Sequence, residues 1–397
     1  MPWPRNEIMR RRFLALFATA AASLVAIGVG AFLLSRGEDE EGKAAPVEAS
    51  TRSLILYTIG ASTDPYRDSS PNGFGVARLR NERFVRVAEV RNEQLGWFNG
   101  AEWLDRRRIV VPQGAPPFRR RLIFRLSDSD LVRERPLPLP GRDTTVAFSP
   151  DRHSIASEPI EPCKPEQKTV WECYRQTGEI YLQRADGSGR RLLSEGHLDA
   201  WTPDGRLLVT SLDYNKPYAA LDVQTGDRSL PLDPKRMATF AGTSGAAVVG
   251  TPRWSADGRY IAARISARWP TKATLAAVVI ADTSGKPLRL LHSRYVISMF
   301  AWSPKGHRLA YTTSGFPDPH ELFIVDSPEA PARRVMTTER HFDWVSWAPD
   351  SRRLVLDDPV ENLWWLVPAQ PPYTFVTSPR LGGRPLWCCP VNMYATQ

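Results

Sequence analysis

Hydrophobic and polar positions recur along this chain as one repeated phrase. An aromatic residue is followed by a small polar residue, a Pro or Ala, an Asp-Gly-like pair, and then a basic and aliphatic run. The copies are AFSPDRHSIAS at Ala147, AWTPDGRLLVT at Ala200, RWSADGRYIAA at Arg253, AWSPKGHRLAY at Ala301 and SWAPDSRRLVL at Ser346, with a degraded copy, EWLDRRRIVV, at Glu102. Pro, Asp and Gly favour tight turns, and aliphatic runs on either side favour strands. The phrase therefore predicts a β-hairpin at each copy.

The repeat has a nearly constant length. Its aromatic residues follow one another at intervals of 45 to 53 residues: Trp103, Phe148, Trp201, Trp254, Trp302 and Trp347. Two further strand-like segments follow each hairpin, for example EIYLQRADGSG at Glu179 and the segment 191–193. Four short strands in this length of chain are typical of one blade of a β-propeller. We therefore predict an all-β propeller of four-stranded blades, with the repeat aromatics packed between neighbouring blades.

The two ends of the repeated region predict how the ring closes. Segments 54–59, 73–79 and 84–90 resemble the second, third and fourth strands of a blade that lacks its first strand. At the other end, the segment 384–387 places Trp387 40 residues after Trp347. Pairing of these segments would complete a seventh blade and remove an exposed sheet edge. The alternative is a six-bladed ring with 54–90 as an extension; we expect seven blades.

The repeated phrase also carries a family resemblance. The tandem pattern Trp-[Ser/Thr]-[Pro/Ala]-Asp-Gly-[Arg/Lys], followed by an aliphatic strand and an [Ile/Leu]-x-[Val/Leu]-x-Asp strand, resembles the TolB-like (WD-repeat-like) β-propeller family. Its best copies are at Trp201, Trp254 and Trp302, and the resemblance covers about residues 53–390. It implies the propeller fold. Because propellers host unrelated activities, function has to be argued from a site.

The N-terminus predicts a membrane anchor. Residues 13–34 form an uncharged run that, as a helix, would span about 33 Å and cross a bilayer core. Four arginines precede this run and four acidic residues follow it, which places the N-terminus in the cytoplasm. We expect a cytoplasmic tail over 1–12, a transmembrane signal-anchor helix over 13–34, a polar linker over 35–52, an extracytoplasmic propeller over 53–390 and a C-terminal tail over 391–397. The alternative is secretion after cleavage of a signal peptide.

Four cysteines fit an oxidising compartment. Cys163 and Cys173 flank an insertion rich in Pro and charged residues, and we expect a disulfide between them. Cys388 and Cys389 are adjacent in the predicted closing strand. A vicinal disulfide and two buried thiols are both compatible with this pair, and a redox or metal site is a further alternative.

The net charge of +9 bears on the partner. Small basic clusters lie at 106–108 and 119–121. For a domain outside the membrane, such a charge suits anionic lipid headgroups or acidic wall polymers, and we predict no nucleic-acid partner. A generally basic surface without a specific partner is the alternative.

No enzyme signature stands out. The chain has no Gly-x-Ser-x-Gly elbow, no His-Glu-x-x-His and no phosphate-binding glycine loop, and its six histidines are scattered, so we predict no cofactor and no metal site. In a propeller, residues that lead into the first strand of each blade surround one mouth of the channel. By offset from the repeat aromatics these are Asn99, Thr144, His197, Asp199, Ser298, Asp343, Trp344 and Arg384.

From this set we predict a ligand-binding mouth formed by Asn99, His197, Asp199, Asp343, Trp344 and Arg384. His197, Asp199 and Asp343 are expected to converge on a cation or polar ligand; water-bridged channel groups are the alternative. The loops 61–72 and 158–178 are the expected recognition loops. The sequence thus indicates a membrane-anchored, non-catalytic scaffold that binds an envelope protein or polymer. The alternative is an extracytoplasmic glycan hydrolase or lyase with paired carboxylates at the mouth.

Overall fold

The computed structural model describes the strands of the repeated region and most of their turns. The described residues are 54–59, 73–91, 101–103, 107–113, 120–135, 143–159, 177–211, 217–243, 247–268, 274–291, 296–314, 319–342, 344–358, 363–377 and 385–388. The chain divides into two compact units, Met1–Ala45 and Pro46–Gln397, and all described residues belong to the second. The predicted tail, anchor helix, linker and C-terminal tail lie outside the described residues and stay predictions. Within the described residues, no helix is long and apolar enough to cross a membrane.

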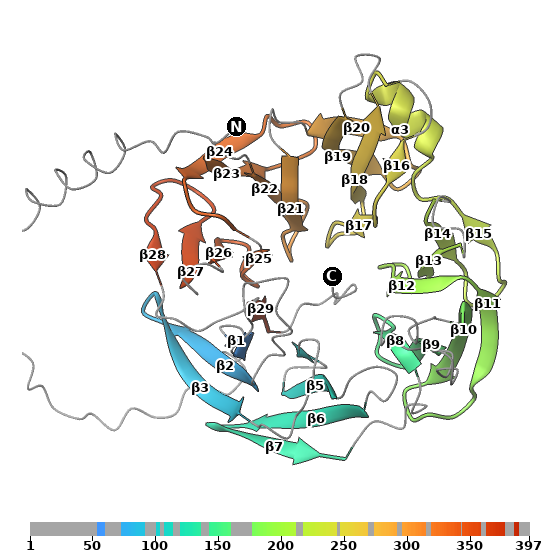
Figure 1. Cartoon of the computed structure of the whole chain (residues 1–397), viewed down its shortest axis with the longest axis horizontal. Helices are drawn as coiled ribbons and strands as arrows, with labels where there is room; N and C mark the ends of the chain where they lie inside the picture. The colour runs from blue at the N-terminus through green and yellow to red at the C-terminus, as the bar shows by residue number, and fades with distance from the viewer. Residues whose placement is uncertain are drawn as a thin grey trace, which may run out of the picture. The chain divides into compact units, whose positions relative to one another are not determined.

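The second unit is a seven-bladed β-propeller, as predicted (Figure 1). In blades 2 to 4 the four strands follow the chain order. Blade 2 consists of β4 (Glu102–Trp103), β5 (Arg108–Gln113), β6 (Arg120–Ser127) and β7 (Asp130–Glu134), and blade 3 of β8 (Asp143–Phe148), β9 (Ser154–Pro159), β10 (Glu179–Arg184) and β11 (Arg191–Glu195). Blade 4 consists of β12 (His197–Trp201), β13 (Leu207–Thr210), β14 (Ala219–Leu221) and β15 (Arg228–Ser229). Blades 6 and 7 are β21 (Val296–Trp302), β22 (Leu309–Ser314), β23 (His320–Val325) and β24 (Arg333–Thr338), then β25 (Trp344–Trp347), β26 (Arg353–Asp358), β27 (Leu363–Pro368) and β28 (Val376–Thr377).

Blade 1 joins the two ends of the repeated region. It consists of β29 (Leu386–Trp387), β1 (Leu54–Ile59), β2 (Gly73–Arg80) and β3 (Arg83–Arg91), in that order from the inside outwards. β29 runs antiparallel to β1, with Leu386 opposite Leu56. The Cys388 N–H extends this contact by donating to the Leu54 carbonyl at 2.7 Å. This pairing confirms seven blades over six.

Blade 5 departs from the expected pattern in two ways. Its inner strand is split into β16 (Val248–Val249) and β17 (Arg253–Trp254), which both pair with β18 (Tyr260–Arg268); β19 (Thr274–Asp282) and β20 (Pro287–Leu291) complete the blade. It is preceded by a short helix, α3 (Pro234–Phe240), that the repeat pattern did not predict. The Asp233 carboxylate caps this helix by accepting from the Lys235 N–H at 2.9 Å, and Pro234 suits its first turn.

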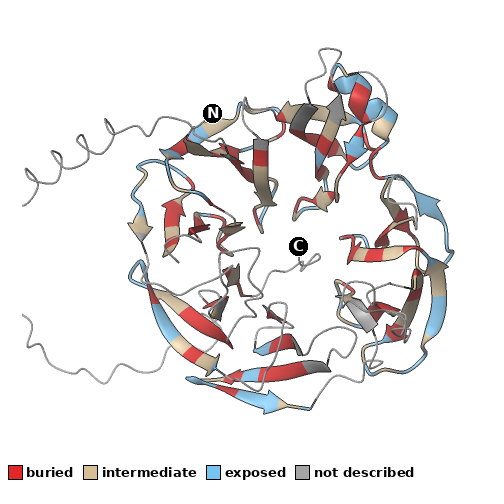
Figure 2. Cartoon of the chain, in the orientation of Figure 1, coloured by how far each residue is buried: buried red, intermediate tan, exposed pale blue. Residues whose placement is uncertain are grey.

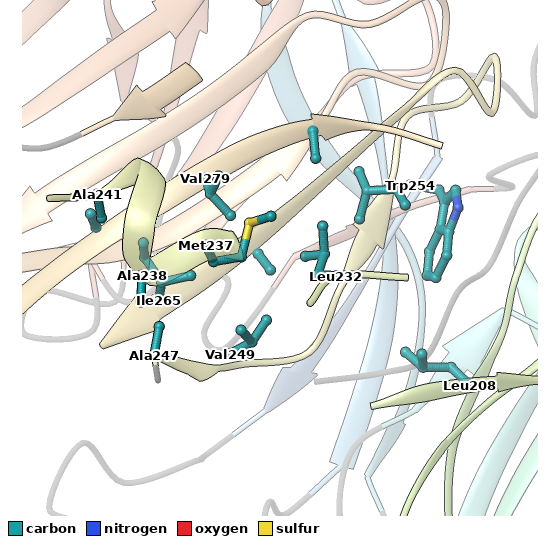
Figure 3. Close-up of a cluster of buried hydrophobic side chains, with 14 of the residues drawn as sticks. Leu208, Leu232, Met237, Ala238, Ala241, Ala247, Val249, Trp254, Ile265 and Val279 are labelled. Atoms are coloured by element: carbon teal, nitrogen blue, oxygen red, sulfur yellow. The ribbon is translucent and has the colours of Figure 1, made fainter. Parts of the chain in front are cut away.

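The hydrophobic core is divided among the spaces between blades. Buried side chains along the strands form seven clusters among the described residues, one at each junction between consecutive blades. Figure 2 shows buried residues on the strands of every blade. At the junction of blades 4 and 5, Leu208 of β13 lies in one cluster with Trp254 of β17 and with Met237 and Ala238 of α3 (Figure 3). The helix therefore covers one end of an inter-blade core.

The repeat tryptophans link consecutive blades, which confirms their predicted packing role. The indole Nε1–H of Trp201 donates to the Ala147 carbonyl at 2.9 Å, across the junction of blades 3 and 4. Equivalent bonds run from Trp103 to Leu386 at 3.1 Å, from Trp302 to Arg253 at 2.8 Å and from Trp347 to Ala301 at 3.0 Å. In each case the acceptor residue directly precedes the repeat aromatic of the preceding blade.

The polar residues of the repeated phrase hold the turn between first and second strands. The Ser255 hydroxyl donates to Asp257 Oδ1 at 2.6 Å and accepts from the Tyr260 N–H at 3.0 Å. Gly258 completes this turn with a φ of 71°, a conformation that favours glycine. Ser149 and Asp151 repeat the arrangement in blade 3. The Ser-x-Asp-Gly phrase therefore stabilises the turn in which it stands.

Candidate binding site on the top face

We call the top face the side of the ring on which inner strands begin and second strands end; the opposite side is the bottom face. Several inner strands carry a β-bulge near this face, at positions singled out from the sequence. The strand register shifts around Asp199 in β12, around Ser298 in β21 and around Thr144 in β8. A bulge redirects the side chains beside it, so neighbours along such a strand can meet different partners.

His197, at the start of β12, pairs with a buried carboxylate of blade 3. Its Nδ1 lies 2.7 Å from Oε1 of Glu158, whose side chain is 0 % exposed. The second oxygen, Oε2, accepts from the Leu198 N–H at 2.9 Å. Burial raises the pKa of Glu158, and the bonds from Leu198 and His197 oppose that rise. This contact fixes the orientation of the imidazole ring at the junction of blades 3 and 4.

Asp199, only two residues further along β12, has a different environment. Its Oδ2 is shielded from solvent and accepts no hydrogen bond from any described residue. Burial raises the pKa of Asp199, while the positive charge of Arg253 in blade 5 lowers it. Burial also lowers the pKa of Arg253. Beside this pair, the Thr251 hydroxyl and the Tyr218 phenol are 2.9 Å apart and bridge blades 4 and 5.

A second polar group of the top face lies on blades 6 and 7. Arg340 Nη1 lies 3.1 Å from Asp358 Oδ2, and the Asp358 side chain is 2 % exposed. The Arg340 guanidinium also sits 5.5 Å from the ring centre of Trp365. The rings of His320 and His341 lie edge to face, with their centres 4.8 Å apart. A cation, aromatic rings and imidazoles are thus held together at the junction of these two blades.

The structure describes three of the six predicted mouth residues. His197 and Asp199 share a strand but face different blades, Glu158 of blade 3 and Arg253 of blade 5. Trp344 begins β25, and its Nε1–H donates to the Pro385 carbonyl at 3.1 Å. The other predicted positions lie outside the described residues: Asn99, Asp343, Arg384, the pair Cys163 and Cys173, and most of the loops 61–72 and 158–178. Their predicted roles stay predictions.

Two charged residues around these groups were missed from the sequence: Glu158 on the top face, and Arg253 towards the bottom-face end of the inner strand of blade 5. Arg253 occupies the position before the repeat aromatic, where other copies have Ala147, Ala200 and Ala301. That departure from a small residue was a usable signal. Glu158 gave a weaker signal, as the one charged residue of a short strand, SIASEP.

Cys388, which is 1 % exposed, is disulfide-bonded. Of the alternatives for the vicinal pair, a free thiol at Cys388 is therefore wrong. Among the described residues, no group of three or more His, Cys, Asp or Glu side chains could hold a metal ion.

The fold defines a class, a seven-bladed β-propeller, and comparisons with known proteins agree at that level. No protein-family model matches the sequence, and no curated protein matches it significantly. A functionally unknown protein from Desulfotomaculum acetoxidans is 9 % identical with a TM-score of 0.52, covering 85 % of this chain and 99 % of that one. A protein from Lactobacillus plantarum is 15 % identical with a TM-score of 0.51, covering 84 % and 99 %.

TolB from Acinetobacter baumannii is also similar, with 15 % identity and a TM-score of 0.42, covering 84 % of this chain and 81 % of that one. The propeller fold that the resemblance to the TolB-like family implied is the fold that the seven blades show.

Proposed function

We propose that the protein is a non-catalytic binding propeller that engages a protein partner through its top face. The observation that carries this proposal is the way charged groups of that face are held in place. Glu158 fixes His197 across one blade junction, and Asp358 fixes Arg340 beside Trp365 at another. Side chains held in one orientation before binding lose little conformational entropy when a partner arrives. Imidazole, guanidinium and indole groups suit recognition of a polar protein surface.

The same geometry removes Glu158 as a carboxylate for the hydrolase alternative. Glycoside hydrolysis needs two carboxylates that both reach the substrate. Glu158 is fully buried, and both of its oxygens are engaged by His197 and by the Leu198 N–H. It therefore cannot act as the second carboxylate beside Asp199 without a rearrangement of the blade junction.

The location of the propeller is part of the proposal. The uncharged run 13–34 supports a single-pass anchor, with the arginines before it in the cytoplasm and the propeller outside. A disulfide at Cys388 fits an oxidising compartment. An envelope protein or a cell-wall or membrane polymer would then be the available partner. Protease treatment of intact and lysed cells tests this topology: an extracytoplasmic propeller is cleaved in cells whose cytoplasm stays closed.

In-cell crosslinking of the full-length chain, read by mass spectrometry, tests the partner. The test variant is His197→Gln, which breaks the pair on the top face. The matched control is His307→Gln, because His307 Nδ1 lies 3.0 Å from Asp257 Oδ2 in a pair of the same kind on the bottom face. Thermal melts of both variants check that each is folded.

We expect the wild type and the His307→Gln control to crosslink to the same protein partner. We expect the His197→Gln variant to lose that crosslink. Equal recovery with all three would remove the top face from the proposal. If the purified protein hydrolyses a glycan and Asp199→Asn abolishes that activity, hydrolysis replaces binding as the function.

A further inference from the structure

The outer strands of blades 1 and 2 each carry an exposed valine that lies opposite an arginine. Val85 on β3 is 50 % exposed, and Val132 on β7 is 41 % exposed. In the strand register, Val85 lies opposite Arg78 and Val132 lies opposite Arg125, so the two valines occupy equivalent places. β3 and β7 contact each other on the outside of the ring, where Figure 2 shows exposed residues on both strands. Two exposed apolar side chains among arginines therefore share one part of the rim.

This part of the chain also carries most of the net charge. Residues 73–142 contain fifteen arginines and eight acidic residues, a net charge of +7 out of the +9 of the whole protein. Along the sequence, the basic character of the molecule is therefore concentrated in the stretch that contains the third and fourth strands of blade 1 and the whole of blade 2. A charge gathered on one side gives a molecule a preferred orientation towards an anionic surface.

Two acidic residues on these outer strands are already paired. Glu89 on β3 accepts from Arg86 at 2.7 Å and from Arg91 at 3.2 Å. Glu134 on β7 accepts from Arg125 at 2.8 Å. Exposed Arg83 and Arg133 have no ion pair within the described part of the chain. The remaining acids of the two hairpins lie at or beside their turns: Glu82, Asp128 and Asp130. We call Arg83, Val85, Val132 and Arg133 the basic rim; Val132 and Arg133 follow one another on β7, so they flank the free outer edge of that strand from opposite faces.

We propose that the basic rim docks against an anionic lipid surface. Phosphate headgroups would accept from the two arginines, while the two valines would enter the boundary between headgroups and acyl chains. The valines favour lipid over a soluble acidic polymer. Phosphates of a polymer would make the same contacts with the arginines, but a polymer offers no apolar region for the valines to enter. The arginines also protect these outer strands from pairing with another sheet edge. That protective role needs charge alone and makes no use of the two valines.

Vesicle cosedimentation of the propeller unit, residues 46–397, tests the proposal without the predicted anchor. This unit is compact and its ring closes within itself, so it can be produced alone. The vesicles are phosphatidylcholine, with or without about one third phosphatidylglycerol. The test variants are Arg83→Gln/Arg133→Gln and Val85→Asn/Val132→Asn. The charge-matched control is Arg259→Gln/Arg352→Gln, which removes two exposed arginines from the bottom-face turns of blades 5 and 7.

We expect the wild type to bind only the anionic vesicles, and less at higher salt. The Arg83→Gln/Arg133→Gln variant should bind these vesicles about 25-fold more weakly, because each basic residue near such a surface contributes about 1 kcal/mol. The valine pair should bind about tenfold more weakly, and the control about as well as the wild type.

Equal losses in the control and the arginine pair would overturn the proposal, since only total charge would then matter. If the Val85→Asn/Val132→Asn variant binds the vesicles as well as the wild type does, and soluble polyphosphate competes fully, the partner of the basic rim is an acidic polymer and not lipid. No binding of the wild type to anionic vesicles would refute both.

Discussion

Two repeat tryptophans offer a matched measurement of the hydrogen bonds that join the blades. Trp347 and Trp387 are both 5 % exposed and stand at equivalent places in blades 7 and 1. The Trp347 Nε1–H donates to the Ala301 carbonyl at 3.0 Å, whereas Trp387 Nε1 is shielded and has no hydrogen-bond partner in the described part of the chain. Replacement by Phe removes the same atoms from both sites. The two losses of apolar burial therefore nearly cancel in a comparison.

What remains is the hydrogen bond. A typical intramolecular bond contributes about 0.5–1.5 kcal/mol net, and removing an unbonded buried N–H relieves a desolvation cost. We therefore expect Trp347→Phe to lower the free energy of unfolding by about 1–2 kcal/mol more than Trp387→Phe does. For a unit of this size that corresponds to a difference in Tm of roughly 1.5–3 °C.

Urea unfolding followed by far-ultraviolet circular dichroism measures this difference, with equal m-values as the check that both variants unfold alike. Trp302→Phe is a second bonded case and should behave like Trp347→Phe. If Trp387→Phe costs as much as or more than the other two, the indole bonds do not stabilise the ring, and the repeat tryptophans act through packing alone.

Three further perturbations follow from the structure. Asp199→Asn should stabilise the propeller at pH 7 by roughly 1 kcal/mol, a common size for one polar substitution, and should not do so near pH 3. The reason is that burial raises the pKa of Asp199, so its ionised form opposes folding as the pH rises through that pKa; pH-dependent urea unfolding shows it. Stability should also fall as the pH falls below about 4, because hydrogen bonds from Ser284 and the Lys286 N–H lower the pKa of Asp282 and similar bonds act on Asp222. Asp282→Asn should flatten that loss, and an unchanged acid profile would contradict the assignment. Gly75→Ala should cost about 1–3 kcal/mol in thermal unfolding, since its Cβ would lie 2.5 Å from the buried Tyr57 ring; an unaltered Tm would mean that the ring moves freely.

The propeller was predictable from sequence because its signals are local and repeated. Each copy of the phrase contains its own turn, built by a hydroxyl and a carboxylate such as Ser255 and Asp257, so the hairpins do not depend on distant contacts. The seventh blade followed from the placement of Trp387 relative to Trp347. α3 escaped notice because it is seven residues long and interrupts a repeat otherwise made of strands.

The candidate site was less predictable, and β12 shows why. His197 and Asp199 are two residues apart, so an unbroken strand would place both side chains on one face. A bulge between Leu198 and Ala200 breaks that alternation, and the two residues have different neighbouring blades as partners. Counting from a repeat aromatic locates the end of a strand but not the irregularities within it. Partners such as Glu158 come from another blade and have no fixed sequence offset.

The pairing of Leu386 with Leu56 sets a time order on assembly. These residues are 330 positions apart in the sequence, and bringing such distant segments together costs about 5 kcal/mol in chain entropy beyond a length-independent part. Junctions between consecutive blades need no such closure, so most of the ring can be built while β1 still has an open edge. The bond from Trp103 to the Leu386 carbonyl then forms only when β29 arrives. A chain cut before residue 386 would keep the other six blades but leave the edge of β1 exposed. Quality-control proteases could then recognise the unfinished ring by this exposed edge.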